Sequence, residues 1–151
     1  MGRTSNARGR LIDAISELIW VGSYGTTSVD DICQKAGVKK GSFYYFFESK
    51  ADLAIAAIDG EWQRRRVELD AIFSPVVPPL VRFEKLAEYI HREQKEASER
   101  FGCVLGCPLF ALGAEVSTHE AKLQKKIEEV LDYKRKYFES AIRDAHGKTG
   151  A

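Results

Sequence analysis

The segment Thr26–Lys50, TTSVDDICQKAGVKKGSFYYFFESK, contains the start and end signals of two short helices. Ser28 is a favourable N-cap residue, and Asp31, three residues later, complements the positive end of the helix dipole. Gly37 supplies the tight turn that ends the first helix, and Val38 follows as an apolar plug between the two helices. Two short helices joined by Ala-Gly-Val are typical of a helix-turn-helix.

The second helix is expected to begin near Lys39 or Lys40 and to contain the aromatic run Phe43–Phe47. At about 100° per residue, the three phenylalanines of this run share one face, whereas Tyr44 and Tyr45 point to the other side. A tyrosine beside lysines can donate its hydroxyl to a phosphate oxygen and pack its ring on a sugar. The competing interpretation is a core face with a solvated rim, which is the commoner origin of an aromatic helix flanked by lysines.

A further helix is predicted to begin after Ser49, which is suited to cap it, with Leu53, Ala57 and Ile58 on its inner face. Lys50 stands at the start of this helix, where a positive charge is unfavourable for the helix dipole. A bound anion would explain that position.

The rest of the chain is also predicted to be helical, which makes the fold class all-α. Ahead of the helix-turn-helix, Leu11, Ile15 and Leu18 lie on one stripe of a helix that is expected to end near Tyr24 and Gly25. After it, three prolines separate two long helices, and a last helix runs from about residue 122 to 145. The apolar faces expected for the second long helix and the last helix are Phe83, Leu86, Ala87 and Ile90, and Leu123, Ile127, Val130, Leu131, Phe138, Ala141 and Ile142, respectively.

The composition sets limits on the function. The chain has 151 residues, 44% of them hydrophobic, and a formal net charge of +1, so the total charge does not indicate a nucleic-acid partner. Any such inference depends on where the lysines lie. No apolar run reaches membrane-spanning length, and no signal-peptide core is present. Three cysteines do not form a secreted disulfide framework, so a cytoplasmic protein with reduced thiols is expected.

Residues 8–60, with the run GTTSVDDICQKAGVKKGSFYYFFESKADL, resemble the DNA-binding domain of the tetracycline-repressor (TetR) family of bacterial regulators. The resemblance implies an N-terminal three-helix, helix-turn-helix DNA-binding domain over residues 1–50. A helical ligand-binding and dimerisation domain would follow over residues 51–151. The second helix of the motif would enter the major groove, and nearby side chains would hold the DNA backbone. The DNA-binding residues implied by the resemblance are Thr27, Ser28, Lys39, Lys40, Gly41, Ser42, Tyr44, Tyr45 and Lys50.

Two positions depart from the family pattern. Phe46 stands where many members have histidine, so a polar contact from that position is absent. Asp30 is acidic and close to the expected path of the DNA backbone, so it should weaken non-specific affinity.

The family's mode of action implies a repressor that binds a palindromic operator on double-stranded DNA as a homodimer. An unidentified small-molecule effector would release it, and no cofactor, metal ion or membrane is implied. The candidate effector-binding residues are Trp62, Phe83, Tyr89, Cys103, Cys107 and Phe110. Family members usually continue with one or two more long helices, so the C-terminal part is expected to be incomplete relative to the family.

Cys103 and Cys107 are four residues apart and would face the same side of a helix. Small buried core residues are the plain interpretation, because free cysteine is among the most buried residue types. A thiol-based sensor of oxidants or electrophiles is an alternative function, and it requires a lowered thiol pKa. A metal site is disfavoured because no clustered histidine accompanies the pair.

An enzyme is not expected. The sequence contains no glycine-rich phosphate loop, no HExxH motif, no serine nucleophile elbow and no convincing pair of carboxylates. A third class is a helical interaction protein that keeps the fold without binding DNA. Specific binding to a palindromic DNA fragment would indicate a regulator and exclude this third class.

Overall fold

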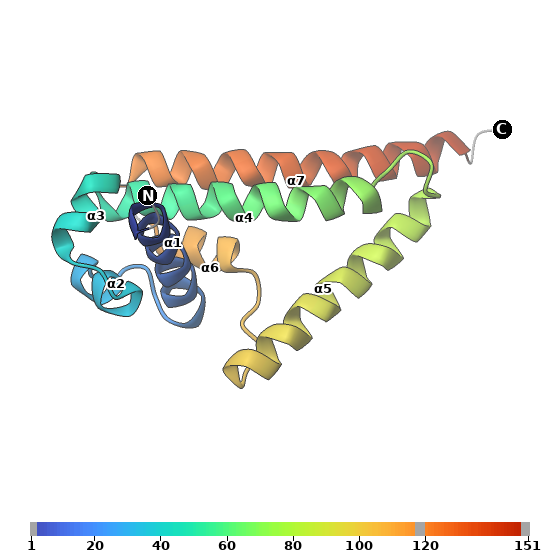
Figure 1. The fold of residues 1–151 in the computed structure, drawn as a ribbon. Helices are drawn as coiled ribbons and strands as arrows, with labels where there is room; N and C mark the ends of the chain where they lie inside the picture. Colours follow the sequence, from blue (N-terminus) through green and yellow to red (C-terminus); the bar gives the residue numbers. More distant parts are fainter. Residues whose placement is uncertain (1–2, 117–119, 149–151) are drawn as a thin grey trace. The chain divides into compact units, whose positions relative to one another are not determined.

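The computed structural model describes residues 3–116 and 120–148, and within these residues the chain forms seven α-helices, which confirms the predicted all-α class (Figure 1). The helices are α1 Arg3–Val21, α2 Val29–Ala36, α3 Lys40–Phe46, α4 Lys50–Ile72, α5 Pro79–Phe101, α6 Pro108–Glu115 and α7 Ala121–Lys148. Among the described residues, no helix is both long and apolar enough to cross a membrane.

The chain divides into two compact units that are each discontinuous in sequence. The first unit comprises Met1–Gly60 and Leu105–Ile127, and the second comprises Glu61–Val104 and Glu128–Ala151. Helices α4 and α7 therefore each contribute to both units. The functional division at residue 50 remains a prediction, since the two compact units describe packing and not activity.

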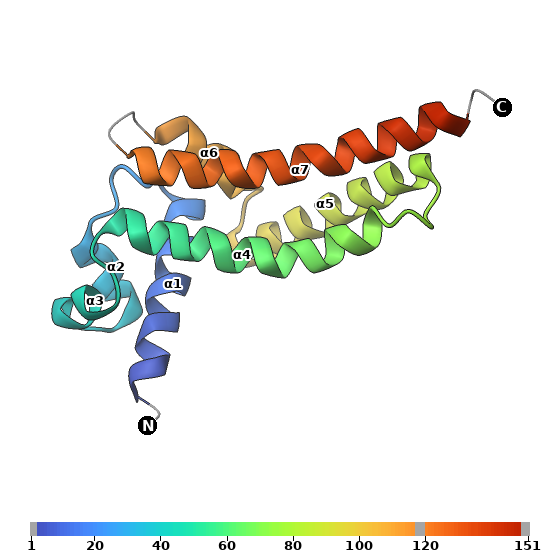
Figure 2. The ribbon, with the colours of Figure 1, turned by 90° about the horizontal axis from the view of Figure 1, so that it is seen from above.

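The first unit contains α1, α2, α3 and α6 together with the first parts of α4 and α7. Helices α1, α2 and α3 gather around the start of α4 (Figure 2). Its core is apolar, and its largest apolar side chains that are completely removed from solvent are Leu11, Ile15, Ile32, Phe43, Leu53 and Leu123. They come from five different helices, so burial of this core fixes the short helices α2 and α3 against the longer ones.

The second unit packs aromatic side chains of α4, α5 and α7 together with Phe73, which directly follows α4. Trp62 stacks on Tyr133 with ring centroids 5.7 Å apart. Phe73 contacts Phe83, Tyr137 and Phe138 at centroid distances of 6.2, 5.1 and 5.8 Å, respectively. Each of these distances lies in the range in which aromatic pairs add stability beyond the area they bury.

The apolar face expected for α5 is partly wrong. Ala87 and Ile90 are exposed, and the buried residues of this helix include Arg82 and Tyr89. Arg82 is buried because its Nε donates to the carbonyl of Val77 at 2.9 Å and its Nη1 pairs with Asp144 at 2.7 Å. Polar side chains with partners of this kind can occupy an inner face that hydrophobic periodicity assigns to apolar residues.

Candidate nucleic-acid interface

Helix α2 begins where the sequence predicted. Ser28 is its N-cap, and the Ser28 hydroxyl oxygen accepts from the backbone N–H of Asp31 at 3.1 Å. In return, the backbone N–H of Ser28 donates to the Asp31 carboxylate at 2.8 Å, which completes a capping box. The Ser28 hydroxyl also donates to the Asp31 carboxylate at 2.6 Å. This bond, followed by the one from the Ser28 backbone N–H, holds the pKa of Asp31 below its usual range.

The turn between α2 and α3 depends on Gly37, which has φ 63° and ψ 40°. This left-handed conformation is costly for a residue with a side chain. The N–H of Gly37 donates to the carbonyl of Gln34 at 3.2 Å, and the N–H of Val38 donates to that of Cys33 at 3.0 Å. The predicted helix-turn-helix is therefore present, with α3 as its second helix.

The aromatic run divides between core and solvent, as predicted. Phe43 and Phe47 are buried, and Phe46 is half-buried. Tyr44 and Tyr45 are exposed, with 55% and 76% of their surface accessible. Because buried rings anchor the helix from one side, the two tyrosines are presented to solvent on a fixed backbone.

The first turn of α3 lies open to solvent. Lys39, Lys40 and Gly41 are exposed, and Ser42 is half-buried. A side chain placed at Gly41 would meet no neighbouring atom within 4 Å, so another surface can approach the backbone closely there. Side chains that carry cations, hydroxyls and phenol groups on one helix surface can donate to phosphates and to base edges.

Lys40 already has a partner in the unbound protein. Its ammonium lies 2.9 Å from the Asp30 carboxylate, and both side chains are more than half exposed. The hydrogen bond to Asp30, followed by the charge of that carboxylate, raises the pKa of Lys40. The lysine predicted to read DNA is therefore paired with the acidic residue that departs from the family pattern.

The side chains of Thr27 and Lys50 point into the protein. The Thr27 hydroxyl is buried and donates to the carbonyl of Ser23 at 2.6 Å. The Lys50 ammonium donates to the carbonyls of Tyr24 and Thr27 at 2.8 and 2.9 Å and lies 4.1 Å from the centre of the Tyr24 ring. Carbonyl oxygens thus account for a lysine at a helix start, and phosphate contacts from these two residues remain predictions.

Tyr24 is buried in the first unit, and no residue pattern predicted a role for it beyond the end of the first helix. Burial and the nearby carboxylate of Glu120 raise the pKa of its phenol well above the usual value, so it stays protonated. Its hydroxyl donates to Glu120 at 3.2 Å, across 96 positions of the sequence. No local pattern could reveal that contact.

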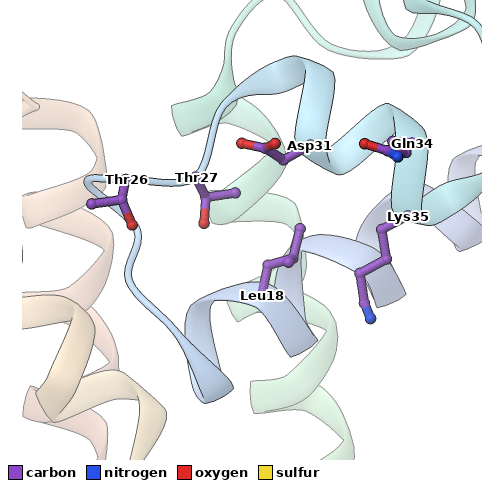
Figure 3. Close-up of a pocket in the computed structure, with 6 residues that line it drawn as sticks. All are labelled: Leu18, Thr26, Thr27, Asp31, Gln34 and Lys35. Atoms are coloured by element: carbon purple, nitrogen blue, oxygen red, sulfur yellow. The ribbon is translucent and has the colours of Figure 1, made fainter.

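An open hollow lies beside α2 (Figure 3). Its lining residues are Leu18, Thr26, Thr27, Asp31, Gln34 and Lys35. Small-molecule sites usually enclose most of their ligand, whereas this hollow is wide open to solvent. The hollow therefore does not have the character expected of an effector pocket.

Cys103 and Cys107 do not lie on a common helix, so the predicted shared face is wrong. Helix α5 ends at Phe101, and Gly102 and Gly106 both have positive φ, of 77° and 72°. Cys103 lies exposed between these glycines, and Cys107 is the half-buried N-cap residue of α6. Because Cys103 is exposed and Cys107 is only half-buried, the interpretation of both thiols as buried core residues is also wrong.

The candidate effector-binding residues fall in both units. Cys107 and Phe110 belong to the first unit, where Phe110 is exposed on α6. Trp62, Phe83, Tyr89 and Cys103 belong to the second unit, and Trp62 and Tyr89 are buried there. A shared role of these six residues in binding an effector remains a prediction.

Residues 11–57 match the family model described as "Bacterial regulatory proteins, tetR family". The match begins within α1 and ends within α4, so it includes the whole helix-turn-helix.

Two curated relatives and one solved structure extend the similarity over most of the chain. An uncharacterized HTH-type transcriptional regulator in the lacX 3′ region of Lactococcus lactis subsp. lactis is 28% identical over 139 residues, covering 89% of this chain and 68% of the relative. The HTH-type transcriptional regulator LmrA of Bacillus subtilis (strain 168) is 27% identical over 142 residues, covering 91% of this chain and 72% of the relative. A crystal structure of regulatory protein TetR from Rhodobacter sphaeroides is 29% identical, with a TM-score of 0.78, and covers 93% of this chain and 73% of that chain.

Proposed function

Because the chain belongs to the TetR family of bacterial transcriptional regulators, we propose that it represses transcription from a palindromic operator and is released from that operator by a small molecule. It is a DNA-binding regulator of a non-enzymatic family. The observation that carries the proposal is the exposed surface of α3, whose first turn and two tyrosines are held by buried phenylalanines. A helix of this kind fits the major groove of B-DNA.

The proposed DNA contacts divide into two classes. In this proposal Lys40, Gly41 and Ser42 approach base edges, and Tyr44 and Tyr45 contact the backbone; the exposure of Lys40, Gly41 and the two tyrosines supports it. Phosphate contacts supply affinity that depends on salt, whereas contacts to base edges supply sequence preference. Substitutions in the two classes should therefore have different effects.

The proposed release depends on geometry between two copies of the chain. The reading helices of a helix-turn-helix dimer must lie about 34 Å apart, or a multiple of that, to enter successive major grooves. An effector that binds better to a form with another spacing lowers DNA affinity by its difference in affinity for the two forms.

Selection of duplexes from a random pool, followed by sequencing, tests the proposal. We expect enrichment of an inverted repeat, and we expect Lys40→Ala or Ser42→Ala to change the enriched sequence. Tyr44→Ala should weaken binding to all sequences alike. If the wild-type protein enriches no sequence and also fails to bind duplex DNA at low salt, it is a helical interaction protein and the proposal is wrong.

A further inference from the structure

The loop Gly22–Ser28 joins α1 to α2 and is held by a carboxylate from a distant part of the first unit. Oε2 of Glu115, at the C-terminal end of α6, accepts from the hydroxyl of Ser23 at 2.6 Å. The same oxygen accepts from the backbone N–H of Gly25 at 3.1 Å. One carboxylate oxygen therefore fixes a side chain and a backbone group on either side of Tyr24.

Tyr24 itself is held by two other elements. Its hydroxyl donates to Glu120, just before α7, and its carbonyl accepts from Lys50 at the start of α4. Thr27 closes the loop, because its hydroxyl donates back to the carbonyl of Ser23. Charged groups that bind a loop through backbone atoms define its conformation more tightly than side-chain contacts alone.

The position of this loop matters because it leads directly into Ser28, the N-cap of α2. Helix α2 and the turn at Gly37 then set the position of α3. The hydrogen bonds from Ser23 and then from Gly25 also hold the pKa of the Glu115 carboxyl below its usual range. The carboxylate is therefore charged at neutral pH, and its hydrogen bonds are of the stronger, charge-assisted kind.

We infer that Glu115 is a positioning residue for DNA binding: through Ser23 and Gly25 it fixes the loop that places α2, and thereby α3, for entry into the major groove. The inference rests on the proposed function, since it concerns the same DNA interface. Glu115 lies outside residues 11–57, the part matched by the family model, so the match assigns it no role.

The loss of charge and the loss of positioning predict opposite changes in DNA affinity when Glu115 is replaced, which makes the inference testable. Glu115→Ala removes a negative charge, and removal of a negative charge favours binding to a polyanion. Positioning instead predicts weaker binding. Glu84→Ala is the matched control, because Glu84 is an exposed residue of α5 and its substitution changes the net charge equally.

The experiment measures the dissociation constant for the duplex enriched by the wild-type protein, at a temperature at which circular dichroism shows every variant to be folded. We expect Glu115→Ala to weaken binding about tenfold, the size expected from loss of a hydrogen-bonded charged group. Glu115→Gln keeps an acceptor oxygen and should recover part of the affinity, while Glu84→Ala should bind at least as well as wild type. Ser23→Ala should add little in the Glu115→Ala background, because both remove the same contact.

Each outcome decides a different point. If folded Glu115→Ala binds the duplex as tightly as Glu84→Ala, Glu115 does not position the reading helix. If the wild-type protein binds no duplex at all, the proposed function itself fails and the inference falls with it.

Discussion

In the first unit, charged side chains bind backbone atoms of a loop: Lys50 donates to two carbonyls, and Glu115 accepts from an N–H. In the second unit, most of the ionic contacts join one helix side chain to another. Arg66 pairs with Asp70, and Arg92 pairs with Glu68. Pairs between half-exposed side chains contribute little and are weakened by salt, whereas bonds to the backbone fix a particular conformation. The backbone contacts of the first unit therefore define the conformation of a loop, whereas an exposed pair of the second unit, such as Arg92 with Glu68, defines little.

The largest expected difference between the units concerns their phenylalanines. Phe43, in the first unit, is completely buried, whereas Phe138, in the second, is 41% exposed. Phe43→Ala should lower the free energy of unfolding by about 3–5 kcal/mol, because it opens a cavity in a closed core. Phe138→Ala should cost about 1 kcal/mol, since less apolar surface is lost. Urea denaturation followed by circular dichroism compares them, and equal losses would contradict the contrast.

Arg82 belongs to the second unit, but its side chain binds backbone atoms, as Lys50 and Glu115 do in the first unit. It is 1% exposed, and its guanidinium donates to the carbonyls of Val77 and Pro75 at 2.9 and 3.4 Å. Arg82→Met should lower the free energy of unfolding by about 2 kcal/mol, because these carbonyls lose their donor. Arg92→Met, which removes an exposed pair, should have little effect, and its effect should vanish in high salt. Similar losses for both arginines would show that burial of the contact is unimportant here.

A substitution of Lys50 distinguishes its two possible roles, which are to bind loop carbonyls and to contact a DNA phosphate. Lys50→Met should lower the free energy of unfolding by about 1–2 kcal/mol, since Tyr24 and Thr27 lose a charged donor. Lys39→Met, at an exposed N-cap that makes no side-chain capping bond, should leave stability unchanged and weaken DNA binding. Thermal unfolding and the salt dependence of DNA binding are both measured. An unchanged stability of Lys50→Met, together with a salt slope flatter by about 0.9, would identify Lys50 as a phosphate contact instead.

The smallest expected effect on the fold is that of Asp30→Asn. The substitution leaves Lys40 without its partner at 2.9 Å and should not measurably change stability, because both side chains are exposed. Affinity for a random duplex should rise severalfold, because the substitution removes a carboxylate close to the expected path of the DNA backbone and frees the Lys40 ammonium. Asp13→Asn, at an exposed position of α1, is the control for the change in charge. Equal effects of the two variants would mean that the pairing of Asp30 with Lys40 has no influence on binding.

The parts of the fold that were predictable from sequence are those encoded over a few residues. The capping box between Ser28 and Asp31, the turn at Gly37 and the division of the aromatic run follow from spacings of three or four positions. The partners of Lys50 were not predictable, because they lie 26 and 23 positions earlier and are backbone carbonyls, which carry no sequence signature. The contacts of Glu115 with Ser23 and Gly25 span 92 and 90 positions, and they were not predictable for the same reason.

The predictions for the two cysteines and for the inner face of α5 were wrong for other reasons. Gly102 and Gly106 flank Cys103, and a glycine after a long helix commonly ends it in the left-handed conformation. The pattern of four between the cysteines was therefore applied to a segment that is not helical. For α5, hydrophobic periodicity counts arginine as polar, so it cannot recognise Arg82 as a buried residue whose charge is paired with Asp144.

The discontinuity of the first unit has a consequence for building hybrid regulators. A fusion that takes residues 1–60 from this chain and the remainder from another protein would transfer the whole helix-turn-helix. It would leave behind Glu115, which holds Ser23, and Gly106, whose carbonyl accepts from the indole of Trp20 at 3.1 Å. Residues 105–127 therefore have to be transplanted together with residues 1–60, so the smallest exchangeable module of this protein consists of two separate segments.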